Sequence, residues 1–318
     1  MHYLRTPRLY AEERSGVRVT PADMTHSERA APGSFPQRLA SFLRTGWLPT
    51  IHHRLSQVLE TAKTISFDDS SRFVFFSDLH RGDGSGSDSF LPNARLFLNT
   101  LSHYERNGFT YVEVGDGDEL WKGWPFAEIR EAHKRVFDLL HQLDLDRRLH
   151  LIVGNHDQRR KTGQQLEKDG LPVHEGIVMQ HSETSQRLFV VHGHQADITN
   201  DRLVFLAHRA VRLSMRLRGM VRLWNAGPGR ANQMGKLEQR ITDWIKTYQE
   251  IVICGHTHRP AFPKIGEIPY FNTGSGVVPG ILTGLELRHG ALVPIRWTED
   301  PARRPVRELA GPPRRINW

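Results

Sequence analysis

Five short motifs place carboxylate, imidazole and carboxamide side chains close together along the chain, in combinations that suit metal binding. They are Asp78-Leu-His80, Gly115-Asp116-Gly-Asp-Glu119, Gly154-Asn155-His156-Asp157, His192-Gly-His194 and Gly255-His256-Thr-His258. Side chains of these types are ligands for divalent ions of the Zn, Mn or Fe type. Cys254 is the only cysteine, which excludes a Cys-rich structural zinc site. The residue types therefore predict a site for one or two divalent metal ions.

Each motif stands at or just beyond the end of a short apolar run that is typical of a β-strand. The runs are RFVFFS, TYVEV, HLIV, LFVV and IVIC, and segments with helical spacing interrupt the pattern. This alternation predicts an α/β layered fold, in which ligands bind at the loops beyond the carboxyl ends of the strands. We therefore expect the five motifs to converge on one place. Because side chains alternate along an extended strand, Asp78 and His80 should face the same side, and so should His256 and His258.

Two helices and one hairpin are predicted from the signals at their ends. Helical spacing extends over residues 93–107, where Gly108 closes the helix, and over residues 126–143, after Pro125. Residues 285–297 are typical of a β-hairpin that turns at His289-Gly290.

The chain has 318 residues, which is enough for one large domain or two modest ones with a proper core. We predict an N-terminal arm over 1–70 with an amphipathic helix near 51–64, and a Pro/Arg-rich tail over 299–318. The main domain would occupy 71–298 and include a helical cap at 198–250. Hydrophobic residues make up 38% and charged residues 25%, a composition that fits a globular protein and excludes wholesale disorder.

The formal net charge is +8, which favours an anionic partner such as a phosphate ester, an acidic lipid or a nucleic acid. Within residues 201–250, ten Lys or Arg stand against four acidic residues. Arg209, Arg212 and Arg216 recur there at helical spacing, so the cap could cover an anionic substrate or lie on an acidic membrane surface. A solvated outer face is the alternative. Nucleic acid ranks lower, because no aromatic stacking platform accompanies the charges.

The expected location is the cytoplasm, with peripheral membrane contact through the basic cap as the alternative. No apolar run approaches the roughly 20 residues that cross a bilayer. The N-terminus lacks the apolar region of a secretory signal, and a single cysteine forms no internal disulfide. The oligomeric state stays open.

In this order, the five motifs resemble the calcineurin-like metallophosphoesterases, whose pattern is D-x-H, G-D-x-x-D/E, G-N-H-D/E, G-H or H-G, and G-H-x-H. The resemblance covers about residues 73–260. It implies a four-layer α/β sandwich of two mixed β-sheets flanked by helices, and two divalent transition-metal ions (Mn, Fe, Zn or Co) as cofactors. The implied metal ligands are Asp78, His80 and His258 for the first ion, Asn155, His192 and His256 for the second, and Asp116 between the two. His156 would stand beside the substrate, and Asp157 would orient it from behind.

The implied enzyme is a dinuclear metal-dependent phosphoesterase, which hydrolyses a phosphomonoester or phosphodiester by attack of a metal-bridging hydroxide. No covalent enzyme intermediate is expected. His156 would give the leaving alkoxide its proton, because an uncoordinated histidine titrates near neutral pH. Arg81 and Arg259 stand next to ligands and could clamp phosphate oxygens, with Asn155 and His156 as further substrate contacts.

A finer resemblance is to the UDP-2,3-diacylglucosamine hydrolases of lipid A synthesis. Glu119 and Trp121 match their G-D-x-x-E-x-W, and Thr257-His258-Arg259-Pro260 matches their G-H-T-H-R-P. A pyrophosphohydrolase of a nucleotide-sugar lipid, which is a lipid-linked substrate, is therefore the alternative enzyme. His156-Asp157 replaces their Arg-Asp and is the form of general phosphatases and phosphodiesterases. Outside enzymes, the alternative is a metal-free scaffold of the same fold, which would show replaced ligands, whereas every expected ligand type is present.

Overall fold

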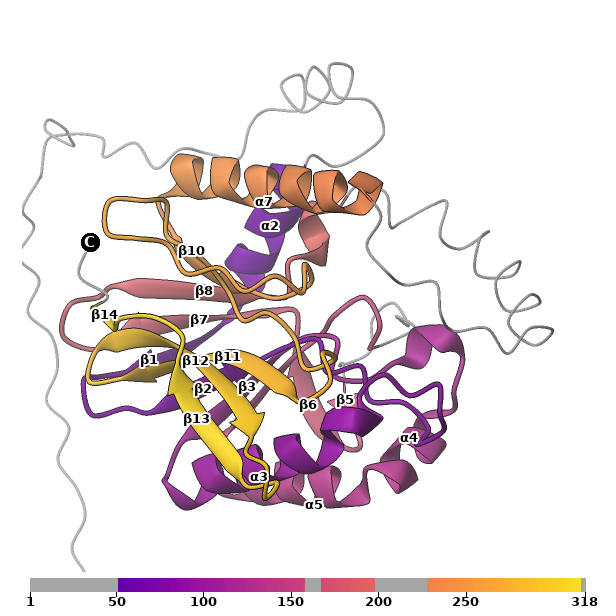
Figure 1. Cartoon of the computed structure of the whole chain (residues 1–318). Coiled ribbons are helices and arrows are strands. Elements are labelled where there is room, and N and C mark those ends of the chain that lie inside the picture. Colours follow the sequence, from indigo (N-terminus) through magenta and orange to yellow (C-terminus); the bar gives the residue numbers. More distant parts are fainter. Residues whose placement is uncertain (1–50, 158–166, 198–227, 316–318) are drawn as a thin grey trace, which may run out of the picture. The chain divides into compact units, whose positions relative to one another are not determined.

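A computed structural model describes residues 51–157, 167–197 and 228–315 of the chain (Figure 1). The larger of its two β-sheets has nine strands. In order across the sheet they are β13 (Pro305–Leu309), β12 (Ala291–Glu299), β11 (Ile281–Arg288), β2 (Phe73–Phe76), β3 (Thr110–Val114), β4 (Leu149–Ile152), β6 (Leu171–His174) and β5 (Glu167–Lys168), with β14 (Arg314–Arg315) paired to β12. Strands β2, β3, β4 and β6 are parallel, whereas β11, β12 and β13 pair antiparallel, so the sheet is mixed.

The smaller sheet has five strands and is also mixed. Its order is β1 (Lys63–Phe67), β7 (Gly176–His181), β8 (Arg187–Val191), β9 (Ile251–Cys254) and β10 (Tyr270–Asn272). Only β7 and β8 pair antiparallel.

Helices cover the outer face of each sheet, which completes four layers (Figure 1). Helices α3 (Ala94–Arg106), α4 (Phe126–Ala132) and α5 (Lys134–Leu145) lie on the larger sheet, and α2 (Ile51–Thr61) and α7 (Pro228–Tyr248) lie on the smaller one. Short 3-10 helices are η1 (Leu91–Asn93), η2 (Leu120–Lys122) and η3 (His194–Ala196). The predicted fold, a sandwich of two mixed sheets flanked by helices, is confirmed.

The alternation of side chains along β2 shows how the layers pack. Val74 and Phe76 join the apolar cluster beneath α3 and α5, whereas Phe73 and Phe75 join the cluster between the two sheets. Every residue of β2 is buried because both faces of the strand are covered, which explains its continuous apolar sequence. A third cluster includes Trp244 of α7 and lies between the smaller sheet and its helices.

Most predicted elements are present, with one correction. Helix α3 begins and ends within one residue of the predicted 93–107, and Gly108 follows it with φ 72°. The hairpin is confirmed, since β11 and β12 pair through Arg288 and Ala291, and His289 and Gly290 have φ of 51° and 64°. The predicted helix over 126–143 is instead two helices, which are separated at His133. The His133 imidazole is buried and its Nε2 lies 2.7 Å from Asp88 Oδ2, a contact that helical spacing cannot predict.

Strand pairing extends into the predicted arm and tail. Residues 51–70 supply α2 and the edge strand β1, and the tail supplies β13 and β14. In the predicted cap, residues 198–227 with Arg209, Arg212 and Arg216 lie outside the described residues, and the remainder is α7, whose Trp244 packs against Phe189. The division into arm, main domain and tail stays a prediction. Among the described residues, no helix combines the length and the apolar character needed to cross a membrane.

Candidate metal centre

The five motifs lie on the loops that follow β2, β3, β4, β8 and β9. Three groups of their side chains have ligand atoms within 4.8 Å of one another. The groups are Asp78 with His80 and His258, Asp116 with His192 and His256, and His80 with Glu119 and His156. The predicted convergence of the motifs is therefore present in the structure.

The backbone reaches this arrangement differently from our prediction. We expected an extended strand end, but β2 ends at Phe76 and β9 at Cys254. Beyond these ends, five candidate ligands have left-handed backbone conformations, with positive φ at Asp78 (51°), His80 (52°), Asp116 (52°), His256 (67°) and His258 (58°). Such φ values are uncommon outside glycine and tend to persist at functional sites that the surrounding structure holds in place. The side chains meet because the loops turn sharply, and strand alternation is not the reason.

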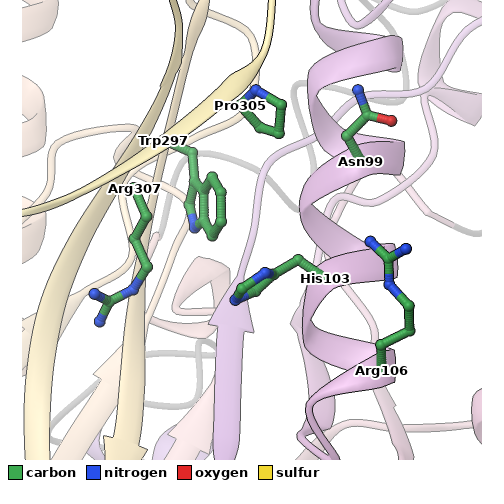
Figure 2. A pocket seen from close by; sticks show the side chains of 6 residues that line it. All are labelled: Asn99, His103, Arg106, Trp297, Pro305 and Arg307. Atoms are coloured by element: carbon green, nitrogen blue, oxygen red, sulfur yellow. The ribbon is translucent and has the colours of Figure 1, made fainter.

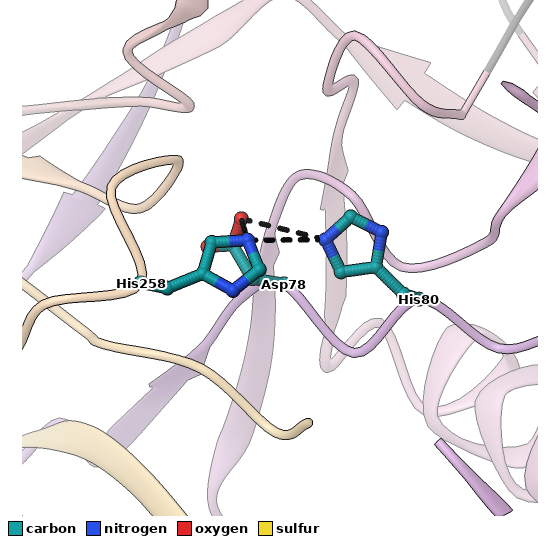
Figure 3. A group of neighbouring side chains, drawn as sticks. All are labelled: Asp78, His80 and His258. Carbon is teal, nitrogen blue, oxygen red and sulfur yellow. Dashed lines mark hydrogen bonds and ion pairs between the residues drawn. The ribbon is translucent and has the colours of Figure 1, made fainter. Parts of the chain in front are cut away.

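The first group brings three donor atoms to one point (Figure 3). His258 Nε2 lies 3.1 Å from Asp78 Oδ1 and 3.2 Å from His80 Nε2, and His80 Nε2 lies 3.9 Å from Asp78 Oδ1. Ligands at about 2.1 Å from a tetrahedral ion lie roughly 3.4 Å apart. The spacing of the three donors is therefore suited to a single transition-metal ion.

The second group is joined to the first through Asp116. Its Oδ2 lies 3.1 Å from His192 Nε2 and 3.9 Å from His80 Nε2. His192 Nδ1 donates a hydrogen bond of 2.8 Å to the Val114 carbonyl, which leaves the lone pair of Nε2 directed at the site. Asp116 thus stands between one histidine of each group.

Two buried ligand atoms, Asn155 Oδ1 and His256 Nε2, lack hydrogen-bond partners among the described residues. Asp78 Oδ1 and His192 Nε2 face other candidate ligands, His258 and Asp116, each at 3.1 Å. A buried polar atom that is left unpaired costs about 1–3 kcal/mol, unless a ligand satisfies it. Carboxylate, carboxamide and imidazole donors match the preferences of Mn, Fe, Zn and Co, so the predicted set of ligands fits divalent cations.

The charges at the site favour added positive charge. Burial opposes protonation of His192, but Asp116 outweighs it and raises the pKa of His192 to about 9. Burial likewise opposes ionisation of Asp78, but His258 outweighs it and lowers the pKa of Asp78 to about 2. The negative charge of Asp116 that attracts a proton to His192 also attracts a metal cation, and the lowered pKa of Asp78 keeps that carboxylate ionised and able to act as a ligand.

Glu119 is the functional residue whose role the sequence did not predict. Its Oε1 lies 2.7 Å from His156 Nδ1 and its Oε2 lies 3.1 Å from His80 Nδ1, so one carboxylate orients two imidazoles. Burial alone would raise the pKa of Glu119, but its hydrogen bonds to His156 and His80 lower it to about 2. The signal in the sequence was the position of Glu119 in the G-D-x-x-E motif.

Asp157 and Arg81 have roles that correct our predictions. Asp157 Oδ2 accepts hydrogen bonds from the backbone N–H of Asp116 (2.7 Å) and Gly154 (2.8 Å), so within the described residues it fixes the ligand loops and makes no direct hydrogen bond to the His156 ring. The Arg81 guanidinium is fully buried and donates to Glu113 (2.7 and 2.9 Å) and to Asp118 (2.6 Å). Arg81 is therefore not placed to clamp a substrate phosphate.

Arg259 and Trp121 border the candidate site. The Arg259 side chain is 56% exposed, and its Nη1 lies 3.8 Å from Glu238 Oε2, so its predicted contact with substrate stays a prediction. The Trp121 ring lies 5.4 Å from the His156 ring at an angle of 36°. An aromatic side chain thus borders the face of the imidazole that we predict to donate a proton.

A family model described as calcineurin-like phosphoesterase matches residues 71–260. The chain belongs to this family. A search of the curated proteins found no significant match to this phosphoesterase-family chain.

Among solved structures, this calcineurin-like phosphoesterase is similar to vacuolar protein sorting 29 (Vps29) of Cryptosporidium parvum, with 14% identity, coverage of 77% of this chain and 100% of that chain, and a TM-score of 0.38. It is also similar to Vps29 of Chaetomium thermophilum, with 12% identity, coverage of 76% and 97%, and a TM-score of 0.39. The cold-active protein-tyrosine phosphatase of a Shewanella species matches with 15% identity, coverage of 79% and 84%, and a TM-score of 0.40.

Proposed function

We propose that this calcineurin-like phosphoesterase is a dinuclear metal-dependent hydrolase of a phosphomonoester or phosphodiester. The observation that carries the proposal is the pair of donor groups that share Asp116, whose Oδ2 lies within 3.9 Å of a histidine nitrogen from each group. We assign Asp78, His80 and His258 to one ion, Asn155, His192 and His256 to the other, and Asp116 to both. Two divalent cations held there would supply the activated water that attacks phosphorus and the positive charge that offsets the phosphate oxygens.

We assign proton donation to His156. Glu119 holds its Nδ1, so Nε2 is the nitrogen left to face a leaving-group oxygen. Burial opposes the charged form of the ring, but Asp116 and Glu119 outweigh it and raise the pKa of His156 to about 9, which favours a ring that carries a proton to give. Asp157 supports this geometry indirectly, since it fixes the loops that carry Asp116 and Asn155.

The proposal is tested by metal content and turnover in one set of proteins. The purified chain should contain close to two transition-metal ions and should cleave p-nitrophenyl phosphate or its bis-ester. Asn155→Ala and His256→Ala should lose turnover and part of the metal while circular dichroism stays unchanged. His141→Ala is the control, since its side chain is 40% exposed and pairs with Asp169. A metal-free protein without turnover would identify a scaffold instead.

The role of His156 has a separate test. His156→Ala should slow substrates with poor leaving groups far more than substrates with good ones, because only a poor leaving group needs the proton. Equal losses on both kinds of substrate would contradict proton donation.

The substrate is a phosphate ester, either a small molecule or lipid-linked. A screen of phosphomonoesters, cyclic nucleotides, dinucleotide polyphosphates and lipid-linked pyrophosphates separates the proposed activity from the nucleotide-sugar lipid alternative. Mn, Fe, Zn and Co all suit the donor set, so the same screen is run with each metal.

A further inference from the structure

Two adjoining clefts lie where α3 faces β12 and β13. One has a volume of about 510 Å³ and is lined by Asn99, His103, Arg106, Trp297, Pro305 and Arg307 (Figure 2). Figure 2 shows His103 pointing from helix α3 toward Trp297 and Arg307 on the strands. The second cleft, of about 410 Å³, shares His103 and Arg307 and adds Arg72, Glu286, Arg288 and His289.

These clefts are separate from the metal centre. Arg72 directly precedes β2, whereas Asp78 follows the carboxyl end of the same strand. Six residues of extended chain span roughly 20 Å. Arg288 ends β11, which pairs antiparallel with β2 through Leu287 and Phe73, so it lies at the same end as Arg72. The second cleft and the metal ligands therefore lie at opposite ends of the larger sheet, and the first cleft lies between α3 and β13, which is three strands away from β2 in the sheet.

The charge lining the clefts is strongly positive. Arg72, Arg106, Arg288 and Arg307 stand against one carboxylate, Glu286. Glu286 is buried, and both of its oxygens are already engaged. Oε1 accepts from Tyr104 Oη and Arg307 Nε, both at 2.7 Å, and Oε2 accepts from Arg307 Nη2 at 2.6 Å and lies 3.3 Å from Arg288 Nε. This one carboxylate thus holds two guanidinium groups in place and leaves an excess of positive charge.

The other two arginines pair with no carboxylate in the part of the chain that the structure describes. Arg72 Nη1 donates to the Asn107 carbonyl at 3.2 Å, and Arg106 Nε donates to the Ser102 carbonyl at 3.1 Å. The positive charge of the clefts also affects the pKa of His103. Burial lowers the pKa of His103, and Arg106 and Arg307 add to that effect against the opposing charge of Glu286.

We propose that the paired clefts form a binding site for a soluble ligand that carries a diphosphate group. Guanidinium groups donate in a planar fork that matches phosphate oxygens, and a preordered arginine loses little freedom on binding. The cleft volumes lie within the range of small-molecule sites. Two clefts that share His103 and Arg307 in their linings, and that have three more arginines than carboxylates, suit two linked phosphates better than one. The site does not depend on the proposed hydrolase activity.

The test is calorimetric titration of the full-length protein with inorganic pyrophosphate, in wild type and in His256→Ala, which weakens the metal centre. Both proteins should bind pyrophosphate at the clefts. In the His256→Ala background, Arg106→Glu and Arg72→Glu should each weaken binding by about tenfold or more, because each replaces an attraction by a repulsion. Arg135→Glu is the matched control, an exposed arginine of α5 that lines neither cleft, and it should stay within about twofold.

Three outcomes would overturn the proposal. The first is the absence of pyrophosphate binding in His256→Ala. The second is an equal pyrophosphate affinity in Arg106→Glu, Arg72→Glu and Arg135→Glu. The third is full retention of binding both in Arg106→Glu and in Arg72→Glu. Vesicles of phosphatidylcholine with phosphatidic acid distinguish the source of the phosphate. If the protein sediments with the vesicles, if this requires Arg106, and if the vesicles displace pyrophosphate, a soluble ligand is contradicted. If the protein does not sediment with the vesicles, a soluble ligand is supported. Because the variants of Arg106 and Arg72 change the clefts and leave every candidate metal ligand in place, failure here leaves the hydrolase proposal standing, and the reverse also holds.

Discussion

Glu119 and His156 form a hydrogen bond in which the Oε1 and Nδ1 atoms lie 2.7 Å apart, and the remaining oxygen of Glu119 contacts His80. One buried carboxylate therefore connects a metal-ligand candidate to the proposed proton donor. The carboxylate accepts a hydrogen bond from each ring, which fixes one proton on Nδ1 of each and directs Nε2 toward the site.

Glu119→Gln should reduce kcat by about 10- to 100-fold, because an amide can accept from one imidazole only and presents an N–H to the other. The far-ultraviolet circular dichroism should not change. Glu128→Gln, on the exposed face of α4, is the control and should keep full turnover. Wild-type kcat in Glu119→Gln would show that the two hydrogen bonds are structural only.

Gly154→Ala should weaken metal binding by about tenfold or more, since a β-carbon at Gly154 would overlap the Asp116 carboxylate and backbone nitrogen. The φ of Gly154 is not in the left-handed region, so the effect comes from this overlap alone. Metal content after dialysis at a fixed free-metal concentration measures the change. Gly86→Ala, where a β-carbon meets nothing within 4 Å, should behave as wild type. Full metal content in Gly154→Ala would mean that Asp116 is not a ligand.

Lys168→Met should lower the free energy of unfolding by about 3–5 kcal/mol, because it leaves buried carboxylates without their cation. Lys168 Nζ lies 3.0 Å from Glu113, 2.9 Å from Asp118 and 3.0 Å from Asp157. The charge of these carboxylates outweighs burial and raises the pKa of Lys168, so the ammonium form is favoured. Urea denaturation measures the loss. Lys134→Met, whose side chain is 55% exposed, should cost less than about 1 kcal/mol. Similar losses in both variants would contradict a stabilising network.

Asp88→Asn should destabilise the fold by about 2 kcal/mol at pH 7, because Asp88 Oδ2 meets His133 at 2.7 Å and Oδ1 accepts from the Phe90 N–H at 2.9 Å. Burial would raise the pKa of Asp88, but these hydrogen bonds lower it below its usual 3.8. A carboxyl group whose folded pKa is depressed stabilises fully above its unfolded pKa and loses that contribution as pH falls through the folded value.

The difference in unfolding free energy between wild type and Asp88→Asn should therefore be constant above about pH 5 and shrink below about pH 4. Urea denaturation over a pH series measures it. Asp83→Asn, in the same loop, should show a smaller difference at pH 7. A difference that grows as pH falls would reverse the sign and contradict the depressed pKa.

The amino-acid sequence was sufficient to predict the metal-ligand candidates, since donors such as Asp78 and His258 must be of particular chemical types and follow apolar strands. Those strands have local patterns, and β2 is recognisable because both of its faces are buried. The hairpin at His289-Gly290 could also be predicted from a local pattern, because two adjacent residues that adopt positive φ are enough to form its turn. These properties depend on neighbours along the chain.

The partners of the buried charges could not be inferred in this way. Asp157 contacts Asp116 across 41 residues and Glu119 contacts His156 across 37, so these pairings exist only once separate strand-end loops come together. Arg81 follows a metal ligand directly and has the chemistry of a phosphate clamp, yet it turns inward because Glu113 and Asp118 outcompete solvent for it. Long-range packing determines which carboxylate each buried basic side chain contacts. Neighbouring residues in the sequence do not indicate that partner.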